Sequence, residues 1–454
     1  MKVLGLDIGT TTISAVVVEN GTVLSSVTIQ NESFLPSENA WEKIQDPEYI
    51  RNTSLQVVED LLDRYPEVER IGITGQMHGI VYLNSKGEPV TPLYTWQDGR
   101  GDLIFNHDEN YVSYLSKNTG YSLATGYGLV THFYNLKNGL IPKDATVFCT
   151  IQDYVAMVLA GLKAPVIEAS DAASFGIFCV ERGMFDEAAL EKVGISASML
   201  PKLAVSPCIG TYSDKISIYV AIGDNQASFL GATRGKRDAM LVNVGTGSQF
   251  SVYTKEYMQC RGLETRPFPG GGYLLVGASL CGGHAYALLE SFIRGIVEAV
   301  TGTAPDSCYD SMSCILESSL KPKDLPVTKP LFQGSREDPI IRGSIRNIST
   351  KNFSIKHFIW SLLEGMVTEL FEMYEKYICS GGQVVLLVGS GNGLRKNVHL
   401  QKCFEEKFGQ PIIMSNCNEE AAAGAALYAQ MGSIKGDGSV LPYVIGAGSL
   451  YVPQ

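Results

Sequence analysis

The sequence predicts an α/β protein built from two related lobes. Its 454 residues exceed the size at which one hydrophobic core keeps growing, so two domains are the expected organisation. Short apolar strands alternate with amphipathic helical stretches, a pattern typical of α/β lobes. An apolar strand, a Gly-Thr turn and a second β-branched strand occur at residues 3–20 and again at residues 241–255. This hairpin pattern near the start of each half indicates that the lobes are related.

The elements of each half follow from its apolar periodicity. In the first half we expect a hairpin at residues 3–20, helices at 47–65 and 153–160, and strands at 70–74 and 218–222. In the second half we expect a hairpin at residues 241–255, a long helix at 353–378 and a buried strand at 383–388. A glycine loop at 389–393 and helices at 394–408 and 419–430 follow. The last helix is rich in Ala and Gly, which would allow close packing against a neighbour or a flat ligand. The apolar pattern breaks at residues 231–237, so we expect lobes at 1–232 and 233–454.

Composition and charge narrow the class of protein. The net charge of −11 disfavours nucleic acid or an anionic membrane as the main partner, because no basic excess exists to neutralise phosphates. The 10 cysteines are scattered without a CxxC pair, which favours buried thiols over disulfides or structural zinc. An apolar strand follows Met1 at once, with no signal-peptide pattern, and no apolar run is long enough to span a membrane. We therefore expect a cytoplasmic protein; its oligomeric state stays open, and a homodimer is one option.

Both hairpin turns carry groups that suit a nucleotide phosphate. The first turn, DIGTTT, has Asp7 at a strand end, followed by the hydroxyls of Thr10 and Thr11; the second, VGTGSQ, has Gly245, Thr246 and Gly247. Amides and hydroxyls donate to phosphate oxygens, and a carboxylate holds a magnesium ion, often through water. One such turn alone would often be structural. No GxxxxGK[ST] loop occurs, so two hairpins from two lobes are the expected phosphate cradle.

Asp224 is the candidate catalytic base. It follows the apolar run YVAIG, which places it at the carboxyl end of a strand, where α/β sheets position ligand chemistry. The alternative is a helix N-cap, a role that Asp often fills. Phosphoryl transfer to an alcohol needs a carboxylate that accepts the hydroxyl proton, and the two phosphate turns favour that role for Asp224.

Two polar loops after strands are candidates for a polyol-binding site. TGQMHG contains Gln76, Met77 and His78, and TWQDGR contains Trp96, Asp98 and Arg100. Amide, carboxylate and guanidinium groups bind sugar hydroxyls, while thioether and indole surfaces suit the C–H faces of a sugar. His78 or Trp96 taken alone would more often be a core residue, but the position of both motifs in loops directly after strands favours the binding site. The remaining histidines show no metal-ligand spacing, which makes a zinc site improbable, and Cys281 fits a small core residue.

Taken in order, DIGTTT, GQMHG, WQDGR, GDNQAS, NVGTGS and the late GSGNG loop resemble the FGGY family of carbohydrate kinases over nearly the whole chain. The resemblance implies an actin-like (ribonuclease H-like) ATPase fold with a cleft between two lobes. It also implies ATP-dependent phosphorylation of a ketose on its terminal hydroxyl, with ATP and Mg²⁺ as cofactors. Within the family, segments such as YGLVTHFYNLKN and SDAASFGIF are similar to kinases of a seven-carbon ketose.

The resemblance also implies residue roles at the matching positions. Asp224 would be the catalytic base and Asp7 the magnesium-associated carboxylate. The sugar site would be formed by Gln76, Met77, His78, Trp96, Asp98, Arg100 and Asn225. The nucleotide site would be formed by Thr10, Thr11, Gly245, Thr246, Gly247, Gly389, Ser390, Gly391 and Asn392. Two alternatives remain: a sister kinase acting on xylulose, ribulose or glycerol, and a non-catalytic nucleotide-binding switch of the actin type, which would need neither polar loop.

Overall fold

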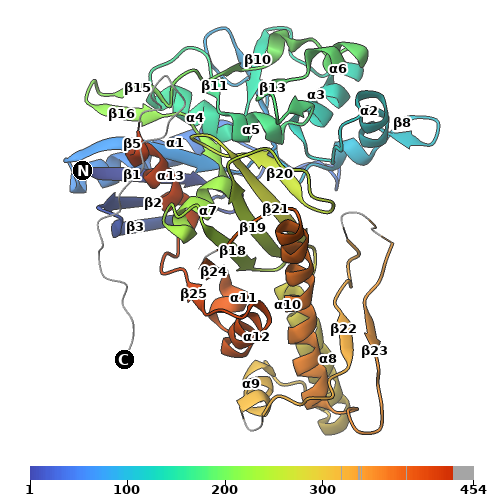
Figure 1. Ribbon diagram of the computed structural model, residues 1–454. Coiled ribbons are helices and arrows are strands. Elements are labelled where there is room, and N and C mark those ends of the chain that lie inside the picture. The colour runs from blue at the N-terminus through green and yellow to red at the C-terminus, as the bar shows by residue number, and fades with distance from the viewer. Residues whose placement is uncertain (318–319, 336–337, 339, 385, 433–454) are drawn as a thin grey trace. The chain divides into compact units, whose positions relative to one another are not determined.

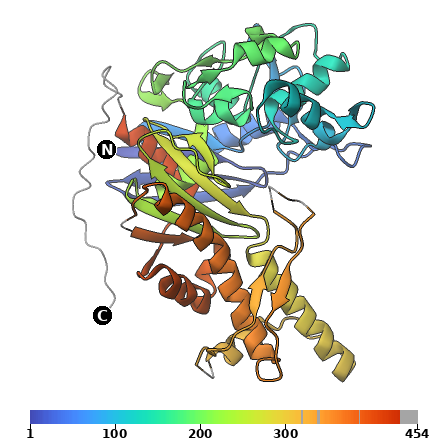
Figure 2. The same ribbon diagram turned by 45° about the vertical axis from the view of Figure 1, so that its right-hand side comes forward.

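The structure is a computed structural model that describes residues 1–317, 320–335, 338, 340–384 and 386–432. Figures 1 and 2 show the chain from two directions. The chain forms two compact units: the first contains Met1–Gly235, Arg266–Tyr273 and residues from 417 onward, and the second contains Lys236–Thr265 and Leu274–Asn416. The units are therefore discontinuous in sequence. The expected division at residue 232 stays a prediction.

The first unit is organised around a seven-stranded sheet. Its strand order is β15-β16-β5-β1-β2-β3, with β17 also paired to β5. The bounds are β15 (Cys208–Tyr212), β16 (Ile216–Tyr219), β5 (Val68–Gly75), β1 (Lys2–Ile8), β2 (Thr12–Glu19), β3 (Thr22–Gln30) and β17 (Ile222–Gly223). β1 and β2 form the predicted antiparallel hairpin, and β5 runs parallel to β1. The single strand expected at residues 218–222 is instead divided between β16 and β17.

Some helices of the first unit pack on this sheet, and others pack among the loops around it. The helices are α1 (Pro47–Arg64), α2 (Tyr111–Thr119), α3 (Gly128–Lys137), α4 (Ile151–Leu159), α5 (Ala169–Ser174), α6 (Glu187–Lys192), α7 (Asp224–Thr233) and α13 (Glu420–Met431), with 3-10 turns η1 (Gly99–Asp102) and η2 (Ala197–Met199). Short strand pairs join the loops: β4 (Ile44–Gln45) with β7 (Leu93–Tyr94), β6 (Val81–Asn84) with β10 (Ala145–Cys149), β8 (Ile104–Asn106) with β9 (Glu109–Asn110), β11 (Val166–Ile167) with β14 (Lys202–Leu203), and β12 (Phe178–Cys179) with β13 (Met184–Phe185). The predicted helices at 47–65 and 153–160 correspond to α1 and α4.

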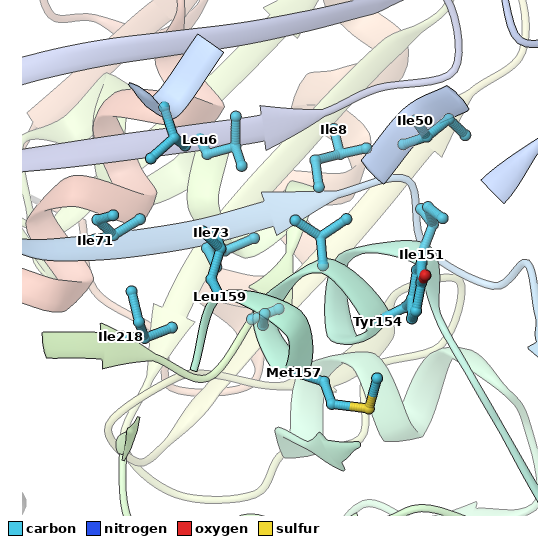
Figure 3. Packing of buried hydrophobic residues seen from close by; sticks show 14 of the residues in the cluster. Leu6, Ile8, Ile50, Ile71, Ile73, Ile151, Tyr154, Met157, Leu159 and Ile218 are labelled. Carbon is cyan, nitrogen blue, oxygen red and sulfur yellow. The ribbon is translucent and has the colours of Figure 1, made fainter. Parts of the chain in front are cut away.

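The core of the first unit lies between the sheet and helices α1 and α4. Figure 3 shows apolar side chains of β1, β5 and β16 facing those of α4, including Ile73 on the sheet and Leu159 on the helix. Both residues are at most 2% exposed. The strands are buried on both faces, which explains why they read as nearly continuous apolar runs in the sequence. This core holds the ends of β1 and β5 in fixed register.

Helix α13 returns from the far end of the chain to the first unit and packs against α7, β1 and β5. The contact is at backbone distance. A Cβ atom built on Gly5 would lie 1.8 Å from the carbonyl oxygen of Ala422, and one on Gly424 would lie 1.8 Å from that of Ala227. The small residues of this helix therefore serve close packing against neighbouring elements, the first of the two roles that its composition predicts.

A six-stranded sheet in the order β20-β21-β19-β18-β24-β25 belongs mainly to the second unit. The bounds are β20 (Glu264–Pro267), β21 (Tyr273–Ser279), β19 (Ser248–Thr254), β18 (Ala239–Val244), β24 (Leu386–Ser390) and β25 (Ile412–Met414). β18 and β19 form the second predicted hairpin, and β24 runs parallel to β18. An antiparallel hairpin beside a parallel strand thus occurs in both units, as expected for related lobes.

The helices of the second unit are α8 (Gly283–Thr301), α9 (Tyr309–Glu317), α10 (Ile355–Cys379), α11 (Asn392–Arg395) and α12 (Val398–Phe408), and a small hairpin joins β22 (Val327–Lys329) to β23 (Ser344–Arg346). Figure 2 shows this hairpin beside the long helix α10, which matches the helix predicted at 353–378. The helix predicted at 394–408 is divided into α11 and α12, because the Asn397 side chain caps a new helix by accepting from the N–H groups of His399 and Leu400. Within the described part of the chain, no helix combines the length and the apolar character that crossing a membrane requires.

Candidate functional site

The polar loops of the first unit leave the sheet at one edge. Three neighbouring strands, β1, β5 and β17, run parallel, and their residues are in register: Asp7 pairs with Thr74, which also pairs with Ile222. Immediately beyond these strands come the Gly-Thr turn, the Gln76–His78 loop and Asp224. Because carboxyl ends of parallel strands meet at the same edge, the three motifs converge there. The sequence predicts that each motif follows a strand. It does not predict which strands pair or in what register, because that pairing joins segments far apart in the chain.

Asp224 is the first residue of α7, and Gly223 occupies the N-cap position without a side-chain cap. The N-cap alternative for Asp224 is therefore wrong in this structure. Burial raises the pKa of the Asp224 carboxyl to about 6, while the positive charge of Arg266 and a hydrogen bond from the Asn225 backbone act in the opposite direction. The side chain is half-buried and retains access to solvent. A carboxylate with a pKa near 6 is largely ionised at neutral pH and suits a general base.

Asp7 lies at the end of β1 with one carboxylate oxygen, Oδ1, buried and without a hydrogen-bond partner. Burial, followed by the negative charges of Asp224 and Glu419, raises the pKa of Asp7 to about 7. An unpartnered oxygen surrounded by like charges suits a divalent cation, which would relieve the repulsion. Among the described residues, no three His, Cys, Asp or Glu side chains lie close enough together to hold a metal by themselves.

Thr10, Gln76, Trp96 and Gln45 form a closed hydrogen-bond circuit. The Trp96 indole Nε1–H donates to Thr10 Oγ1 at 2.9 Å, and Thr10 Oγ1 donates to Gln76 Oε1 at 3.1 Å. Gln76 Nε2 then donates to Gln45 Oε1 at 2.8 Å, and Gln45 Nε2 donates to the Thr10 carbonyl at 2.9 Å. The Thr10 hydroxyl has one hydrogen, and Gln76 takes it. A phosphate contact by Thr10 would therefore use its backbone amide.

The circuit fixes an exposed aromatic surface. Trp96 is 46% exposed although its N–H is hydrogen-bonded, so its ring face is available to a ligand. Gln76 is buried beneath it, and Thr11 lies exposed in the adjoining turn, where its carbonyl accepts from the Asn31 N–H at 2.8 Å. A held indole face beside amide groups is a surface suited to a sugar.

Met77 and His78 follow Gln76. Met77 is buried, and its side chain packs against Gly223, next to Asp224. His78 Nδ1 lies 2.7 Å from the carbonyl oxygen of Ser174, and its ring stacks on Tyr127 with centroids 4.5 Å apart. A carbonyl only accepts, so in the neutral imidazole Nδ1 carries the hydrogen and Nε2 is the acceptor. Asn225, beside Asp224, has a buried Oδ1 with no partner.

Asp98 and Arg100 are placed in the interior, under the loop that carries Trp96. Both are at most 1% exposed. Arg100 donates to Asp98 through Nε at 2.6 Å and Nη2 at 3.1 Å, and through Nη1 to Asn135 at 2.6 Å. Asp98 also accepts from the Arg100 N–H and the Lys43 N–H. Since these groups are occupied by protein partners, this ion pair can support the loop; a direct contact with sugar stays a prediction.

In the second unit, the hairpin turn and the glycine loop lie together. The carbonyls of Gly245 and Thr246 accept from the N–H groups of Gly283 and His284 at 2.9 and 3.0 Å, which fixes the turn against the start of α8. Gly391 has a φ of +86°, and a Cβ there would lie 2.5 Å from the Val244 carbonyl. The turn at 245–247 and the loop at 389–392 are thus adjacent, as a shared nucleotide-binding role requires.

Two residues of the late loop are not in a loop. Gly389 and Ser390 form the end of β24, where they pair with Val242 and Asn243 of β18. The strand predicted at 383–388 therefore begins and ends later, at Leu386–Ser390, and residue 385 lies outside the described residues. Ser390 is fully buried, and its Oγ has no hydrogen-bond partner. Asn392 begins the short helix α11.

Sequence reasoning missed several residues of this site. Arg266 lowers the pKa of Asp224 from a segment more than 40 positions away, and Gln45 closes the Thr10 circuit from β4. Asp171 is fully buried, and its pKa is raised well above its ordinary value by burial and then by Asp153, Glu168 and Asp224. No local pattern marks these residues; the segment SDAASFGIF was noted only for its resemblance.

The chain matches known proteins over most of its length. The model of the N-terminal domain of the FGGY family of carbohydrate kinases matches residues 2–231, and the model of the C-terminal domain matches residues 240–433. Mouse sedoheptulokinase is 28% identical over 472 residues, covering 93% of this chain and 96% of that protein. Xylulose kinase of Bacillus subtilis (strain 168) is 24% identical over 455 residues, covering 95% and 88%.

A solved structure shows the same fold. The crystal structure of xylulose kinase from Rhodospirillum rubrum aligns with a TM-score of 0.80 at 19% identity, covering 95% of this chain and 90% of that one. The architecture is the predicted α/β, actin-like fold with two domains.

Proposed function

Because the chain belongs to the FGGY family of carbohydrate kinases and is an ATP-dependent sugar kinase, we propose that it phosphorylates sedoheptulose on its terminal hydroxyl to give sedoheptulose 7-phosphate. The substrate follows from the similarity to mouse sedoheptulokinase, which extends over nearly the full length of both chains. A sister activity on xylulose, ribulose or another polyol is the second candidate, since the xylulose kinase of Bacillus subtilis is 24% identical and that of Rhodospirillum rubrum has the same fold.

The observation that carries the proposal is the in-register ending of β1, β5 and β17, which gathers Asp7, the Gln76–His78 loop and Asp224 at one edge of the sheet. Sugar binds between the Trp96 face and the polar groups of Gln76, His78 and Asn225. Asp224 accepts the hydroxyl proton as that oxygen bonds to the γ-phosphorus of ATP. The bond from that phosphorus to the β–γ bridging oxygen breaks, and ADP leaves.

In this proposal, Asp7 is the residue that would hold Mg²⁺. The unpartnered Oδ1 and the raised pKa of Asp7 support this role, because Mg²⁺ binds one or two carboxylates together with substrate phosphates. When bound, the ion neutralises phosphate oxygens on which negative charge develops.

The second unit binds ATP in this proposal. The turn at Gly245–Gly247 contacts the phosphates, and the segment Gly389–Asn392 lies beside the adenosine. The close approach of Gly391 to Val244 supports a common site, since only a residue without Cβ fits there. We further propose a cytoplasmic enzyme. The net charge of −11 supports the proposal that it binds neither nucleic acid nor membrane.

Replacing the proposed base tests the mechanism. Asp224→Asn keeps the shape and removes the proton acceptor, so kcat should fall by at least about 100-fold, the usual worth of a general base. Sugar affinity, measured by titration calorimetry, should stay within about threefold because Asn still donates and accepts hydrogen bonds. Near-normal turnover in this variant would refute the assignment of Asp224.

A substrate panel tests the sugar. ADP formation is measured with sedoheptulose, xylulose, ribulose, fuculose, glycerol and no sugar, and kcat/KM should be highest for sedoheptulose. If kcat/KM were higher for one of the other sugars, that sugar would be the substrate instead of sedoheptulose. ADP formation that is independent of every sugar, together with no sugar binding by calorimetry, would favour a nucleotide-binding switch instead.

A further inference from the structure

Helix α5 contacts two of the loops that carry the proposed catalytic groups. It spans only Ala169–Ser174, yet one of its serines bonds to the residue before Asp224 and another bonds to His78. Neither serine belongs to the proposed sugar-binding or nucleotide-binding loops. Both are buried, at 1% and 4% exposure, and cannot reach a ligand in bulk solvent.

Ser170 holds the backbone that leads into Asp224. Its Oγ accepts from the Gly223 N–H at 3.0 Å and donates to Glu168 Oε2. Glu168 Oε2 also accepts from the Ser170 N–H at 2.7 Å, as the N-cap of α5. A hydroxyl has one hydrogen, so the bond to Glu168 turns an Oγ lone pair toward Gly223. The caps of α5 thus orient the group that holds the Asp224 loop.

Ser174 holds the sugar-site loop in the same manner. Its Oγ donates to the Asp171 carbonyl at 2.6 Å and accepts from the His78 N–H at 3.1 Å. Its carbonyl oxygen lies 2.7 Å from His78 Nδ1. His78 has a φ of +75°, a left-handed conformation that costs free energy for a residue with a side chain. The contacts of Ser174 with the His78 backbone N–H and with the His78 ring stabilise this conformation.

The two serines lie four residues apart, so they share one face of the helix and are separated by one turn. The rigid turn therefore fixes the distance between the two loops. Gly223 is also tied to Gly75 by strand pairing, with the Thr74 hydroxyl donating to the Ile222 carbonyl at 2.7 Å. Strand pairing sets where the loops begin, and α5 sets how far apart their functional residues stand.

We propose that α5 is a positioning element in which Ser170 places the base, Asp224, and Ser174 places the sugar-binding imidazole of His78, so that one helical turn sets the spacing between base and substrate. This inference rests on the proposed roles of Asp224 and His78. The two serines should therefore affect different kinetic parameters. Ser170 acts on the chemical step, and Ser174 acts on the binding of sugar.

The experiment compares Ser170→Ala and Ser174→Ala in the full chain, with steady-state kinetics in varied sugar and titration calorimetry of the sugar. Ser170→Ala should lower kcat about tenfold and leave the KM and Kd for sugar within about twofold, because a misplaced base slows chemistry without removing a sugar contact. Ser174→Ala should raise the KM and Kd for sugar about tenfold and leave kcat within about twofold.

Ser54→Ala is the matched control, because Ser54 is a fully buried serine of α1 whose Oγ has no hydrogen-bond partner. It should behave as the unmodified protein does. If either alanine variant fails to fold, Ser170→Cys and Ser174→Cys replace it, since a thiol has similar size and is a weak hydrogen-bonding group. The cysteine variants should show the same separation of kcat from KM.

The proposal is overturned if both variants change the same parameter to a similar extent, or if both match Ser54→Ala. Failure of the proposed function has a different signature, which is an unmodified protein that forms no ADP with any sugar of the panel. Calorimetry still tests α5 in that case, because Ser174→Ala should weaken sugar binding while Ser170→Ala should not.

Discussion

At the scale of the residue, the acid–base state of Asp224 is set by opposing effects. Burial raises its pKa to about 6, and Arg266 holds it lower than burial alone would. The base must be ionised to accept a proton, so kcat/KM should rise with pH on an acidic limb with an apparent pKa near 6. Replacing Arg266 with Met removes the positive charge, which should raise the pKa of Asp224 and move that limb to higher pH.

The measurement is a pH profile of kcat/KM between pH 5 and 8 for both proteins. Arg64→Met, at the exposed end of α1, is the control and should leave the limb in place. A limb that stays fixed in Arg266→Met would mean that another group controls the ionisation seen in the kinetics.

Asp7 makes stability depend on pH in a direction opposite to that of an ordinary paired carboxylate. Its pKa is about 7 in the folded protein against an ordinary value of 3.8, so folding disfavours the ionised form. The free energy of unfolding contributed by Asp7 is therefore lost as pH rises from about 4 to 7. Asp7→Asn should raise the melting temperature of the ligand-free protein, and by more at pH 8 than at pH 5.

The same change should abolish the stabilisation by magnesium. Thermal unfolding of the unmodified protein with ATP should show a higher melting temperature when Mg²⁺ is added, and Asp7→Asn should show little of this increase. Asp63→Asn, at an exposed position of α1, controls for loss of a negative charge. Equal magnesium effects in Asp7→Asn and Asp63→Asn would contradict the role proposed for Asp7.

How far the site could be predicted differs between residues. The positions of Asp7, Gln76 and Asp224 follow from local patterns, since each comes directly after an apolar strand. Asp98 and Arg100 have the chemistry of a sugar site, but the structure pairs them with each other in the interior, an outcome that depends on burial by Tyr94 and Trp41. Arg266 has no local signature, because its effect on Asp224 is created by folding.

At the scale of the element, helix α13 shows what a small-residue pattern means. Its Ala and Gly side chains let the helix backbone touch β1, β5 and α7 directly, at positions such as Gly5 and Gly424. The Arg70 guanidinium donates to the carbonyls of Ala429 and Gln430 at 2.9 and 3.3 Å, which satisfies the end of the helix. The helix itself could be predicted, whereas its partners could not.

Gly424→Ala should therefore destabilise the protein. The added Cβ would lie 1.8 Å from the Ala227 carbonyl oxygen, a backbone atom that cannot move aside cheaply. A loss of about 1–3 kcal/mol in the free energy of unfolding is expected from such overpacking. Chemical denaturation followed by circular dichroism measures it.

Gly295→Ala is the matched control, because Gly295 is also within a helix, α8, but a Cβ there meets nothing within 4 Å. Alanine should stabilise that helix by up to about 1 kcal/mol. If the two variants had the same stability, the close contact at Gly424 would have no energetic weight.

At the scale of the whole molecule, the sequence predicts more than its separate elements suggest. The two hairpins and the alternation of strands with helices predict two related α/β units, and both hairpins are confirmed. What could not be predicted is that the units interleave along the chain, so that segment 266–273 and α13 join the first unit. Contacts between residues this far apart in sequence leave no trace in local periodicity.

The late return of α13 has a consequence for synthesis on the ribosome. The face of β1, β5 and α7 that α13 covers is translated before the second unit, and the covering helix is translated after it. Until α13 has been translated, the apolar, glycine-lined face on which it packs lacks its covering helix. Apolar surface that is exposed during folding is prone to aggregation until its covering element packs on it.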